Sequence, residues 1–414
     1  MIHSESGLYQ FSTPNNKAIY NAVKNELYIN GMPVMPTFNK DSYFGKHDRV
    51  FFTTPERCSL YITLTNTCNF RCGYCMFGCD SKNDFENIDY EKLCKNIVRY
   101  YGNKKIDSMR FFGGEPLCNK QGMVEIINWF KKNYPYEQPK YAIITNGSLL
   151  DKDTCDFMLE NKVLCTLSHD GVSQQYRGNI NVLENPKLVN FFKLLKSDNM
   201  FNISSVMHKH TAGIKKNVEY FIEKLGSENL CIVLYNVLKD DVGGHNTDSQ
   251  LLLATEEDFQ KYHEEYYEAV LQYNQVIVSV LGHLNKFLRD LNNPQKTEVF
   301  AKGNNRLTVH VNGDIVETTN AGERSKGIYK VVGSIYKGNV EDFNKNNYMI
   351  PYEKISDKCE KCLIRTSCTA CWNKFTKQNY GDYNCKSEWY TMSALLKYFI
   401  SFITNEKVIG VGAI

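Results

Sequence analysis

The stretch Ser59-Leu-Tyr-Ile-Thr-Leu-Thr65, followed by Cys68-Asn-Phe-Arg-Cys72-Gly-Tyr-Cys75, decides both the fold and the chemistry expected of this chain. The first part is a short apolar run typical of a buried strand, and the second is a loop with C-x3-C-x2-C spacing. A closed structural metal site takes four protein ligands. Three thiolates would leave one iron of a 4Fe–4S cluster without a protein ligand, so that iron could hold a substrate or cofactor.

Beyond this loop, short apolar runs alternate with stretches that have helical periodicity. A strand followed by a helix, repeated six times, predicts a parallel α/β sheet or barrel. The expected strands are Leu60–Thr65, Ser108–Phe112, Tyr141–Thr145, Val163–Ser168, Asn202–Met207 and Leu230–Asn236. The expected helices cover residues 89–101, 121–133, 151–161, 186–197 and 213–225.

Polar or glycine-rich segments follow the first four of these strands. They are the loop from Cys68, then Gly113-Gly114-Glu115-Pro116, Asn146-Gly147 and Asp170-Gly171. Parallel α/β folds gather their active sites at the carboxyl ends of the strands. A structural metal knot or plain buried cysteines would explain the first loop alone, but not the three loops that follow it. The pattern therefore favours a cluster-binding active site at this edge.

Composition and charge exclude several classes of protein. The 414 residues are 42% hydrophobic and 23% charged, as in an ordinary soluble protein. The chain has 49 basic and 46 acidic side chains, so its net charge is small. We therefore expect no overall positive potential that would attract nucleic acid or an anionic membrane. No apolar run is long enough to span a bilayer, and the N-terminal residues lack a secretory signal. We therefore expect a cytoplasmic protein with neither nucleic-acid nor membrane partners.

The chain has fifteen cysteines, but a disulfide framework is not expected. Such frameworks are typical of small secreted proteins, and this chain is long and lacks an export signal. Eight of them fall into two tight groups, Cys68 to Cys75 and Cys359 to Cys385. Scattered cysteines are expected to be small buried apolar residues. These are Cys58, Cys94, Cys155, Cys165 and Cys231, while Cys79 and Cys118 lie beside motifs and are left undecided.

The cysteine loop and Gly113–Pro116 together resemble the radical S-adenosylmethionine (radical SAM) family, and the likeness extends over residues 59 to 390. In that family the open iron chelates the methionine end of SAM, and the fold is a partial (β/α)6 barrel. The resemblance implies that Gly113, Gly114 and Glu115 hold the methionyl amine. Glycine allows a close backbone approach, and a carboxylate or carbonyl accepts from an ammonium group. A Gly-Gly pair also makes an ordinary turn.

The same resemblance implies further contacts with SAM. Tyr74 would pack on adenine, Asn146 would reach the ribose, Ser168 and Asp170 would bind the carboxylate or ribose hydroxyls, and Arg177 would pair with the carboxylate. Each residue also has a structural interpretation: a core aromatic, a turn residue or a solvated arginine. Nearby His169 is interpreted as structural, because a lone histidine at a strand end rarely acts as a base.

The C-terminal cysteines resemble the SPASM/twitch-type extension of radical SAM enzymes that modify peptides. The resemblance implies one auxiliary 4Fe–4S cluster on Cys359, Cys362, Cys368 and Cys385, with Cys371 either spare or replacing Cys385. A second, inner cluster is not expected, since Phe300 and Thr318 stand where the family has upstream cysteines. Paired C-x2-C units also suit zinc, so a zinc site stays open.

Four segments are expected. Residues 1–57 would form a small β appendage with a turn at Asn30-Gly31, residues 58–250 the partial barrel, residues 251–297 a helical bridge, and residues 298–414 the auxiliary-cluster domain. The appendage looks too short for the peptide-recognition domain of many relatives.

The implied function is that of a peptide maturase. Members of the family cleave SAM to methionine and a 5′-deoxyadenosyl radical, which removes hydrogen from an unactivated carbon, so no protein acid or base is expected. The substrate would be a ribosomally made precursor peptide that gains a thioether, carbon–carbon or ether cross-link, with flavodoxin or ferredoxin as reductant. A sulfatase maturase is one alternative, against which Thr319 counts because that branch has an acidic residue there. The other is a non-catalytic iron–sulfur or zinc protein.

Overall fold

The computed structural model describes residues 1–34, 58–75, 85–211, 213–236, 249–277, 291, 298–301, 306–316, 331–340, 349–351, 359, 361–364 and 382–414. Within these ranges, the largest sheet has nine strands in the order β10-β9-β8-β7-β6-β5-β12-β13-β14. The first six run parallel to one another. They are β5 (Cys58–Thr65), β6 (Ile106–Gly113), β7 (Lys140–Thr145), β8 (Leu164–Ser168), β9 (Phe201–Met207) and β10 (Ile232–Asn236). All six predicted strands are confirmed.

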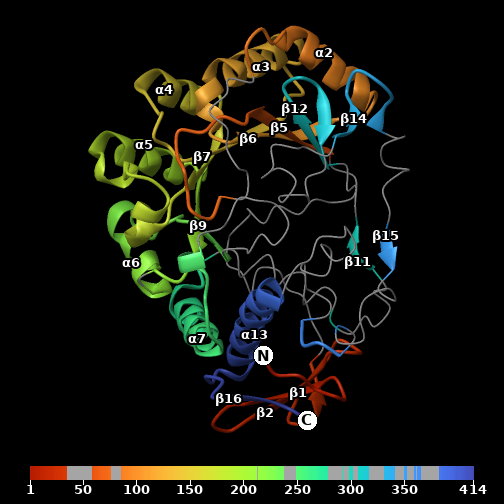
Figure 1. Ribbon diagram of the computed structural model, residues 1–414, viewed down its shortest axis with the longest axis vertical. Coiled ribbons are helices and arrows are strands. Elements are labelled where there is room, and N and C mark those ends of the chain that lie inside the picture. Colours follow the sequence, from red (N-terminus) through yellow and green to blue (C-terminus); the bar gives the residue numbers. More distant parts are fainter. Residues whose placement is uncertain are drawn as a thin grey trace.

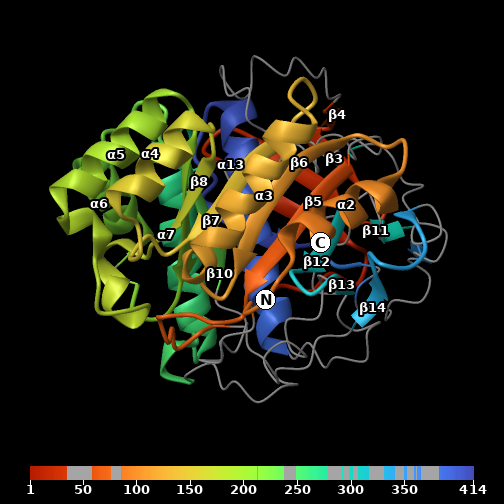
Figure 2. The same ribbon diagram turned by 90° about the horizontal axis from the view of Figure 1, so that it is seen from above.

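Helices that connect these strands cover one face of the sheet, as Figures 1 and 2 show. They are α2 (Tyr90–Tyr101), α3 (Lys120–Asn133), α4 (Lys152–Glu160), α5 (Pro186–Ser197) and α6 (Ile214–Leu225). Side chains that accept backbone N–H groups start several of them, such as Asp89 before α2 and Asp151 before α4. The predicted α/β fold with a parallel sheet is therefore confirmed.

The sheet extends beyond β5 through a strand that lies far away in the sequence. Strand β12 (Arg306–His310) pairs in parallel with β5, with Leu307 opposite Leu60 and Val309 opposite Ile62. Strands β13 (Asp314–Val316) and β14 (Val331–Ser334) then continue it antiparallel. The sequence analysis assigned this region to a separate domain and did not foresee that it joins the main sheet.

The N-terminal segment forms a second sheet with the end of the chain, in the order β16-β1-β2-β3-β4. The predicted turn at Asn30-Gly31 is present, and both residues have positive φ angles of 50° and 81°. Strands β2 and β16 of this sheet were not predicted from the sequence. The strands are β1 (Leu8–Ser12), β2 (Lys17–Asn21), β3 (Glu26–Ile29), β4 (Met32–Pro33) and β16 (Gly410–Ala413).

Two long helices, α7 (Glu256–Tyr273) and α13 (Asp382–Thr404), pack against each other. A capping box between Thr255 and Asp258 starts α7. The buried Tyr267 hydroxyl lies 2.6 Å from Ser401 Oγ and accepts the Val408 N–H, which ties α7 to the end of α13. Helix α7 lies within the predicted helical bridge. A separate short sheet pairs β11 (Glu298–Ala301) with β15 (Met349–Pro351).

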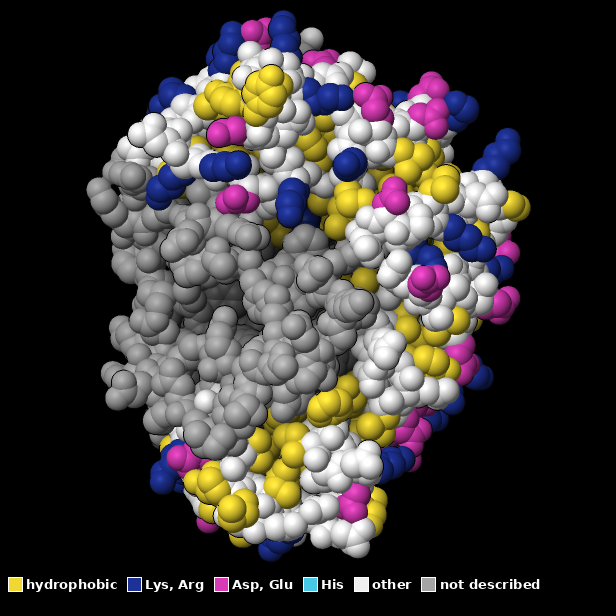
Figure 3. Space-filling view, turned by 180° about the vertical axis from the view of Figure 1, so that it is seen from behind, with side chains coloured by type: hydrophobic (Ala, Val, Ile, Leu, Met, Phe, Trp, Pro, Cys, Tyr) yellow, Lys and Arg dark blue, Asp and Glu magenta, His cyan; other side chains and the backbone are white. Residues whose placement is uncertain are grey.

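The surface agrees with the balanced composition. On the described part of the face in Figure 3, Lys and Arg side chains are interspersed with Asp and Glu, with no large patch of one sign. None of the helices in the described ranges has both the length and the apolar character that crossing a bilayer requires. Among the scattered cysteines, Cys94, Cys155, Cys165 and Cys231 are buried as predicted, whereas the side chain of Cys58 lies outside the described part.

Candidate active site at the carboxyl edge of the sheet

The three-cysteine loop leaves the carboxyl end of β5, where Cys68, Cys72 and Cys75 are all partly buried. The Cys75 N–H donates to the Cys72 carbonyl at 3.0 Å, which closes a turn. Burial raises the pKa of the Cys72 thiol to about 12, while the charge of Arg177 acts in the opposite direction. Among the described residues, no three Cys, His, Asp or Glu side chains already converge on a metal position. The ligand set therefore stays a prediction.

The Gly-Gly pair after β6 lets two loops approach more closely than side chains would allow. A Cβ on Gly113 would lie 2.1 Å from the Thr65 carbonyl oxygen, and one on Gly114 would lie 2.3 Å from that of Thr67. The Gly114 N–H donates to Thr65 at 2.9 Å and the Glu115 N–H to Thr67 at 2.8 Å. The glycines thus fix the backbone that leads into the cysteine loop.

Glu115 is a buried residue that links the ends of two strands. Its carboxylate accepts the Leu117 N–H at 3.0 Å, the Thr145 hydroxyl at 2.7 Å and the Asn146 N–H at 2.7 Å. Burial raises its pKa to about 7, although all three hydrogen bonds favour the ionised form. The side chain therefore holds the β6 and β7 ends together, and any contact with SAM would come in addition to this role.

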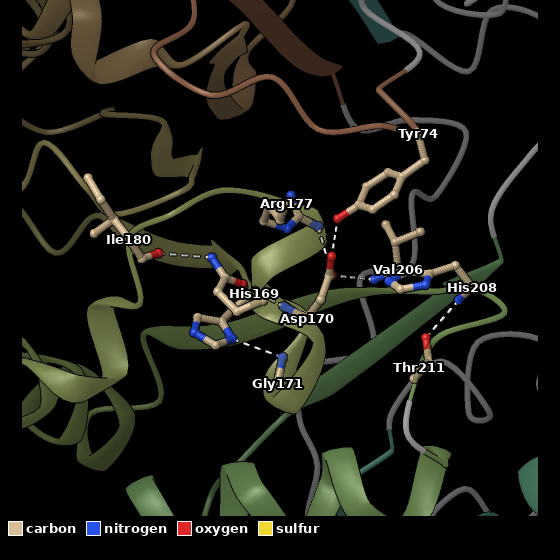
Figure 4. A network of polar contacts seen from close by, with 10 residues as sticks. Tyr74, His169, Asp170, Gly171, Arg177, Ile180, Val206, His208 and Thr211 are labelled. Carbon is tan, nitrogen blue, oxygen red and sulfur yellow. Dashed lines mark hydrogen bonds and ion pairs between the residues drawn. The ribbon is translucent and has the colours of Figure 1, made fainter. Parts of the chain in front are cut away.

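Asp170 connects the loop after β8 to the cysteine loop and to β9, as Figure 4 shows. One carboxylate oxygen accepts from Arg177 at 3.0 Å and from the Val206 N–H at 2.9 Å. The other accepts from the Tyr74 hydroxyl. Asp170 is fully buried, and the Arg177 side chain is only 10% exposed. The predicted residues Tyr74, Asp170 and Arg177 are therefore brought together.

Arg177 keeps one buried donor without an acceptor. Its guanidinium lies 5.5 Å from the centre of the Tyr74 ring, and its Nε makes no hydrogen bond. Buried N–H groups in folded proteins are nearly always paired. The donor set therefore fits an anionic group beside the cysteine loop, such as the carboxylate of SAM.

Two other predicted residues lie at the same edge, and one nearby histidine is structural. The amide of Asn146 donates to Asn69 at 3.0 Å, while Gly147 rather than Asn146 takes the left-handed conformation, with φ of 75°. Ser168 is the partly buried last residue of β8. In His169 the two ring nitrogens contact the Asn181 side chain and the Gly171 N–H, as expected of a structural histidine.

The sequence analysis missed His208, which directly follows β9. It is 1% exposed, and its ring stacks on Tyr74 with centroids 5.8 Å apart. Tyr176 packs edge-on against the same imidazole at 4.9 Å. The rule that located the other motifs, polar residues at the carboxyl ends of strands, applies equally to His208.

Three of the five C-terminal cysteines lie within the described residues. Cys359 is buried, and Cys362 is partly buried beside the N-terminal sheet, where the Tyr9 hydroxyl donates to the Lys361 carbonyl at 2.9 Å. Cys385 is in the first turn of α13. Cys368 and Cys371, like Cys79, Thr318 and Thr319, lie outside the described residues.

Comparisons with known proteins relate part of this chain to a superfamily and most of it to a known fold. Residues 62–227 match the model of the radical SAM superfamily. The radical SAM cyclopropyl synthase TigE of Paramaledivibacter caminithermalis is 25% identical over 227 residues, which are 49% of this chain and 47% of TigE. A cysteine-type anaerobic sulfatase-maturating enzyme of Clostridium perfringens is 27% identical over 187 residues, or 41% of this chain and 50% of the relative. The chain thus spans about half the length of both relatives.

Solved structures share the fold over a larger part of the chain. Native anSMEcpe with bound AdoMet and a peptide has a TM-score of 0.61 at 21% identity, covering 84% of this chain and 98% of that one. SuiB of Streptococcus suis bound to its precursor peptide SuiA has a TM-score of 0.52 at 14% identity, and the match covers 79% of this chain and 74% of SuiB. At these identities the likeness shows the fold alone.

Proposed function

Because this chain carries a radical SAM domain over residues 62–227, we propose that it is a peptide maturase. It would use SAM to remove a hydrogen atom from a ribosomally made precursor peptide and install a thioether, carbon–carbon or ether cross-link. The observation that carries the SAM site is the buried, unpaired Nε of Arg177 beside the cysteine loop.

Cys68, Cys72 and Cys75 supply the three thiols that would hold a 4Fe–4S cluster, and their spacing on one loop supports this ligand set. When bound, the cluster supplies the electron that cleaves SAM to methionine and a 5′-deoxyadenosyl radical. Binding of a metal cluster deprotonates its cysteine ligands and orders them. Thiols that are protonated and separated in the absence of the cluster are therefore consistent with a cluster site.

In this proposal, residues of the chain bind and orient SAM. Arg177 binds the carboxylate of SAM, and Asp170 holds that guanidinium and the Tyr74 hydroxyl in place. The ring of Tyr74 packs on adenine. Ser168 and Asn146 lie at neighbouring strand ends and reach the ribose, while Gly113, Gly114 and Glu115 fix the strand ends beside the methionyl amine.

The inner face of the sheet supports a polar, peptide-like substrate. Side chains opposite the helices include Tyr61, Arg110, Thr166 and Asn202, and Arg110 donates to the Tyr61 hydroxyl at 3.1 Å. On the same face, Thr63 and Thr308 have buried hydroxyls without hydrogen-bond partners. Unpaired polar groups of this kind suit a ligand whose backbone brings N–H and C=O groups. Among the relatives, SuiB has been solved with its precursor peptide.

An auxiliary 4Fe–4S cluster is part of the proposal, with Cys359, Cys362, Cys368 and either Cys385 or Cys371 as ligands, and a flavodoxin or ferredoxin as reductant. Iron and sulfide analysis of the triple variant Cys68→Ala, Cys72→Ala, Cys75→Ala tests it. Retained iron with sulfide supports the auxiliary cluster, whereas zinc alone contradicts it.

A second candidate function is the oxidation of a cysteine or serine of a sulfatase to formylglycine. The relatedness to the Clostridium perfringens enzyme favours it, as does the fold shared with anSMEcpe. Mass spectrometry of treated peptides separates the two functions. A cross-link removes two hydrogen atoms from a precursor peptide, whereas formylglycine creates an aldehyde that reacts with a hydrazine reagent.

Anaerobic reconstitution with iron and sulfide, followed by reduction and detection of 5′-deoxyadenosine, tests the enzyme itself. The wild type and the matched control Cys155→Ala, at a buried cysteine in α4, should form 5′-deoxyadenosine from SAM. Cys72→Ala should lower its formation at least about 100-fold, because the radical chemistry belongs to the bound cofactor. A wild-type protein that carries the cluster but never cleaves SAM would contradict the proposal and favour a non-catalytic iron–sulfur protein.

A further inference from the structure

His208 occupies a position in the site that no motif explains. It directly follows β9, at the same edge of the sheet as the cysteine loop and Asp170. Figure 4 shows its imidazole pointing toward Tyr74 and Asp170. The ring is 1% exposed, stacks on Tyr74 at an interplanar angle of 28°, and meets Tyr176 edge-on. His208 therefore belongs to a cluster of aromatic rings beside the cysteine loop, together with Tyr74 and Tyr176.

Hydrogen bonds define which ring nitrogen of His208 carries the proton. The main-chain N–H of His210 donates to Nδ1 at 3.3 Å, and the backbone N–H of His208 donates to the Thr211 hydroxyl at 2.8 Å. Since Nδ1 accepts, the neutral ring carries its proton on Nε2. Burial lowers the pKa of His208 to about 4, and the charges of His210 and Arg177 act in the same direction against that of Asp170. Near neutral pH this side chain is a donor without charge.

The Nε2–H of His208 is buried and makes no hydrogen bond. The nearby carboxylate of Asp170 already accepts from Tyr74, Arg177 and Val206. Two unpaired buried donors, Arg177 Nε and His208 Nε2, thus adjoin one aromatic ring, that of Tyr74. An anionic group suits the charged guanidinium of Arg177, and a neutral acceptor suffices for the uncharged imidazole of His208.

We propose that His208 Nε2–H donates a hydrogen bond to a ring nitrogen of the adenine of SAM. This inference rests on the proposed function, in which Arg177 takes the carboxylate and Tyr74 packs on adenine. A purine is flat, so it suits a wall of aromatic rings, and its ring nitrogens are neutral acceptors. His208 therefore fixes the in-plane orientation of the base, which Tyr74 alone leaves free to rotate.

Calorimetric titration of the anaerobically reconstituted protein tests this contact, with SAM and methionine as separate probes. His208→Phe keeps the ring against Tyr74 but removes the donor, and should weaken SAM binding about tenfold. Methionine, which lacks adenine, should bind this variant as it binds the wild type. His208→Gln keeps an N–H donor at a similar distance from the backbone and should recover most of the SAM affinity. Iron content, measured alongside, confirms that each variant carries its cluster.

A second titration changes the ligand and compares the wild type with His208→Phe. SAM analogues in which one adenine ring nitrogen is replaced by CH should include one that binds the wild type about tenfold more weakly, and His208→Phe should not distinguish that analogue from SAM.

Several results would overturn the inference. Wild-type SAM affinity in His208→Phe would do so, as would an equal loss of methionine binding, which would mark His208 as merely structural. A rise in the KM for peptide alone would assign the donor to the substrate instead. A wild-type protein that binds iron but not SAM would refute the proposed function itself, and that outcome is distinct because it does not depend on residue 208.

Discussion

The loop after β6 and the loop after β8 lie at the same edge of the sheet but differ in how their buried polar groups are satisfied. In the first, the Glu115 carboxylate accepts three hydrogen bonds from its own chain. In the second, Asp170 is equally well satisfied, yet Arg177 beside it keeps an unpaired donor, and so does His208 at the next strand end. The buried polar groups of the first loop are paired within the chain, whereas those beside the second loop need a ligand to pair with.

This difference separates residues that keep the fold from residues that bind. Gly113, Gly114 and Glu115 match a family motif that is associated with SAM, yet here they mainly join strand ends. Arg177 and His208 carry the unsatisfied donors, so they are expected to affect ligand binding more than stability. Asp170 belongs to both groups, because it holds the binding residue Arg177 through a buried ion pair.

Substitution of Asp170 should have the largest effect on stability. Asp170→Asn leaves the guanidinium of Arg177 buried without a countercharge and should lower the free energy of unfolding by about 3–5 kcal/mol. Urea unfolding of the two proteins measures the loss. Asp156→Asn removes an exposed ion pair with Lys152 and, as the matched control, should change stability by less than about 0.5 kcal/mol. Equal effects at both sites would contradict the buried network.

Gly114→Ala should have the next largest effect, because its Cβ would collide with the carbonyl oxygens of Asn66 and Thr67 at 2.6 and 2.3 Å. We expect a loss of about 2–3 kcal/mol in urea unfolding, together with reduced iron loading, since the displaced backbone leads into the cysteine loop. Gly412→Ala is the control, because nothing lies within 4 Å of its added Cβ. A Gly114→Ala variant as stable and as iron-rich as the control would show that the loops need no close approach.

The smallest expected effect is a pH dependence from Glu115. Its pKa is about 7 in the folded protein against an ordinary value of 4.5, so the folded state binds more protons between these values. Stability should therefore fall as the pH rises from about 4.5 to 7, because the ionised carboxylate that forms in this range is held in a buried site. Urea unfolding at several pH values measures the slope, which Glu115→Gln should flatten. A slope that the substitution leaves unchanged would assign the dependence to another group.

Most of the main sheet could be predicted because buried parallel strands produce continuous apolar runs separated by helical stretches. Strand β12 could not be predicted as a neighbour of β5, since about 240 residues separate them and pairing of this kind leaves no local signal. Strand β16, Gly-Val-Gly-Ala, has too few side chains to mark it as a strand.

The sequence pointed to candidate site residues where strand ends carried recognisable groups of residues, and it gave no signal for a residue that stood alone. Tyr74, Asp170 and Arg177 were each named from the sequence, and only the structure shows that they bond to one another. His208 was missed because one histidine after a strand has no spacing to compare with a motif. Its significance depends on an unpaired buried nitrogen, which sequence cannot show.

We propose that the cysteine loop holds a 4Fe–4S cluster whose fourth iron is open to SAM. Electron paramagnetic resonance of the reduced, reconstituted protein tests it most directly, because a ligand on that iron changes the spectrum of the cluster. We expect that adding SAM shifts the signal, and that Cys359→Ala leaves this shift in place. A loaded cluster whose spectrum is the same with and without saturating SAM would contradict it.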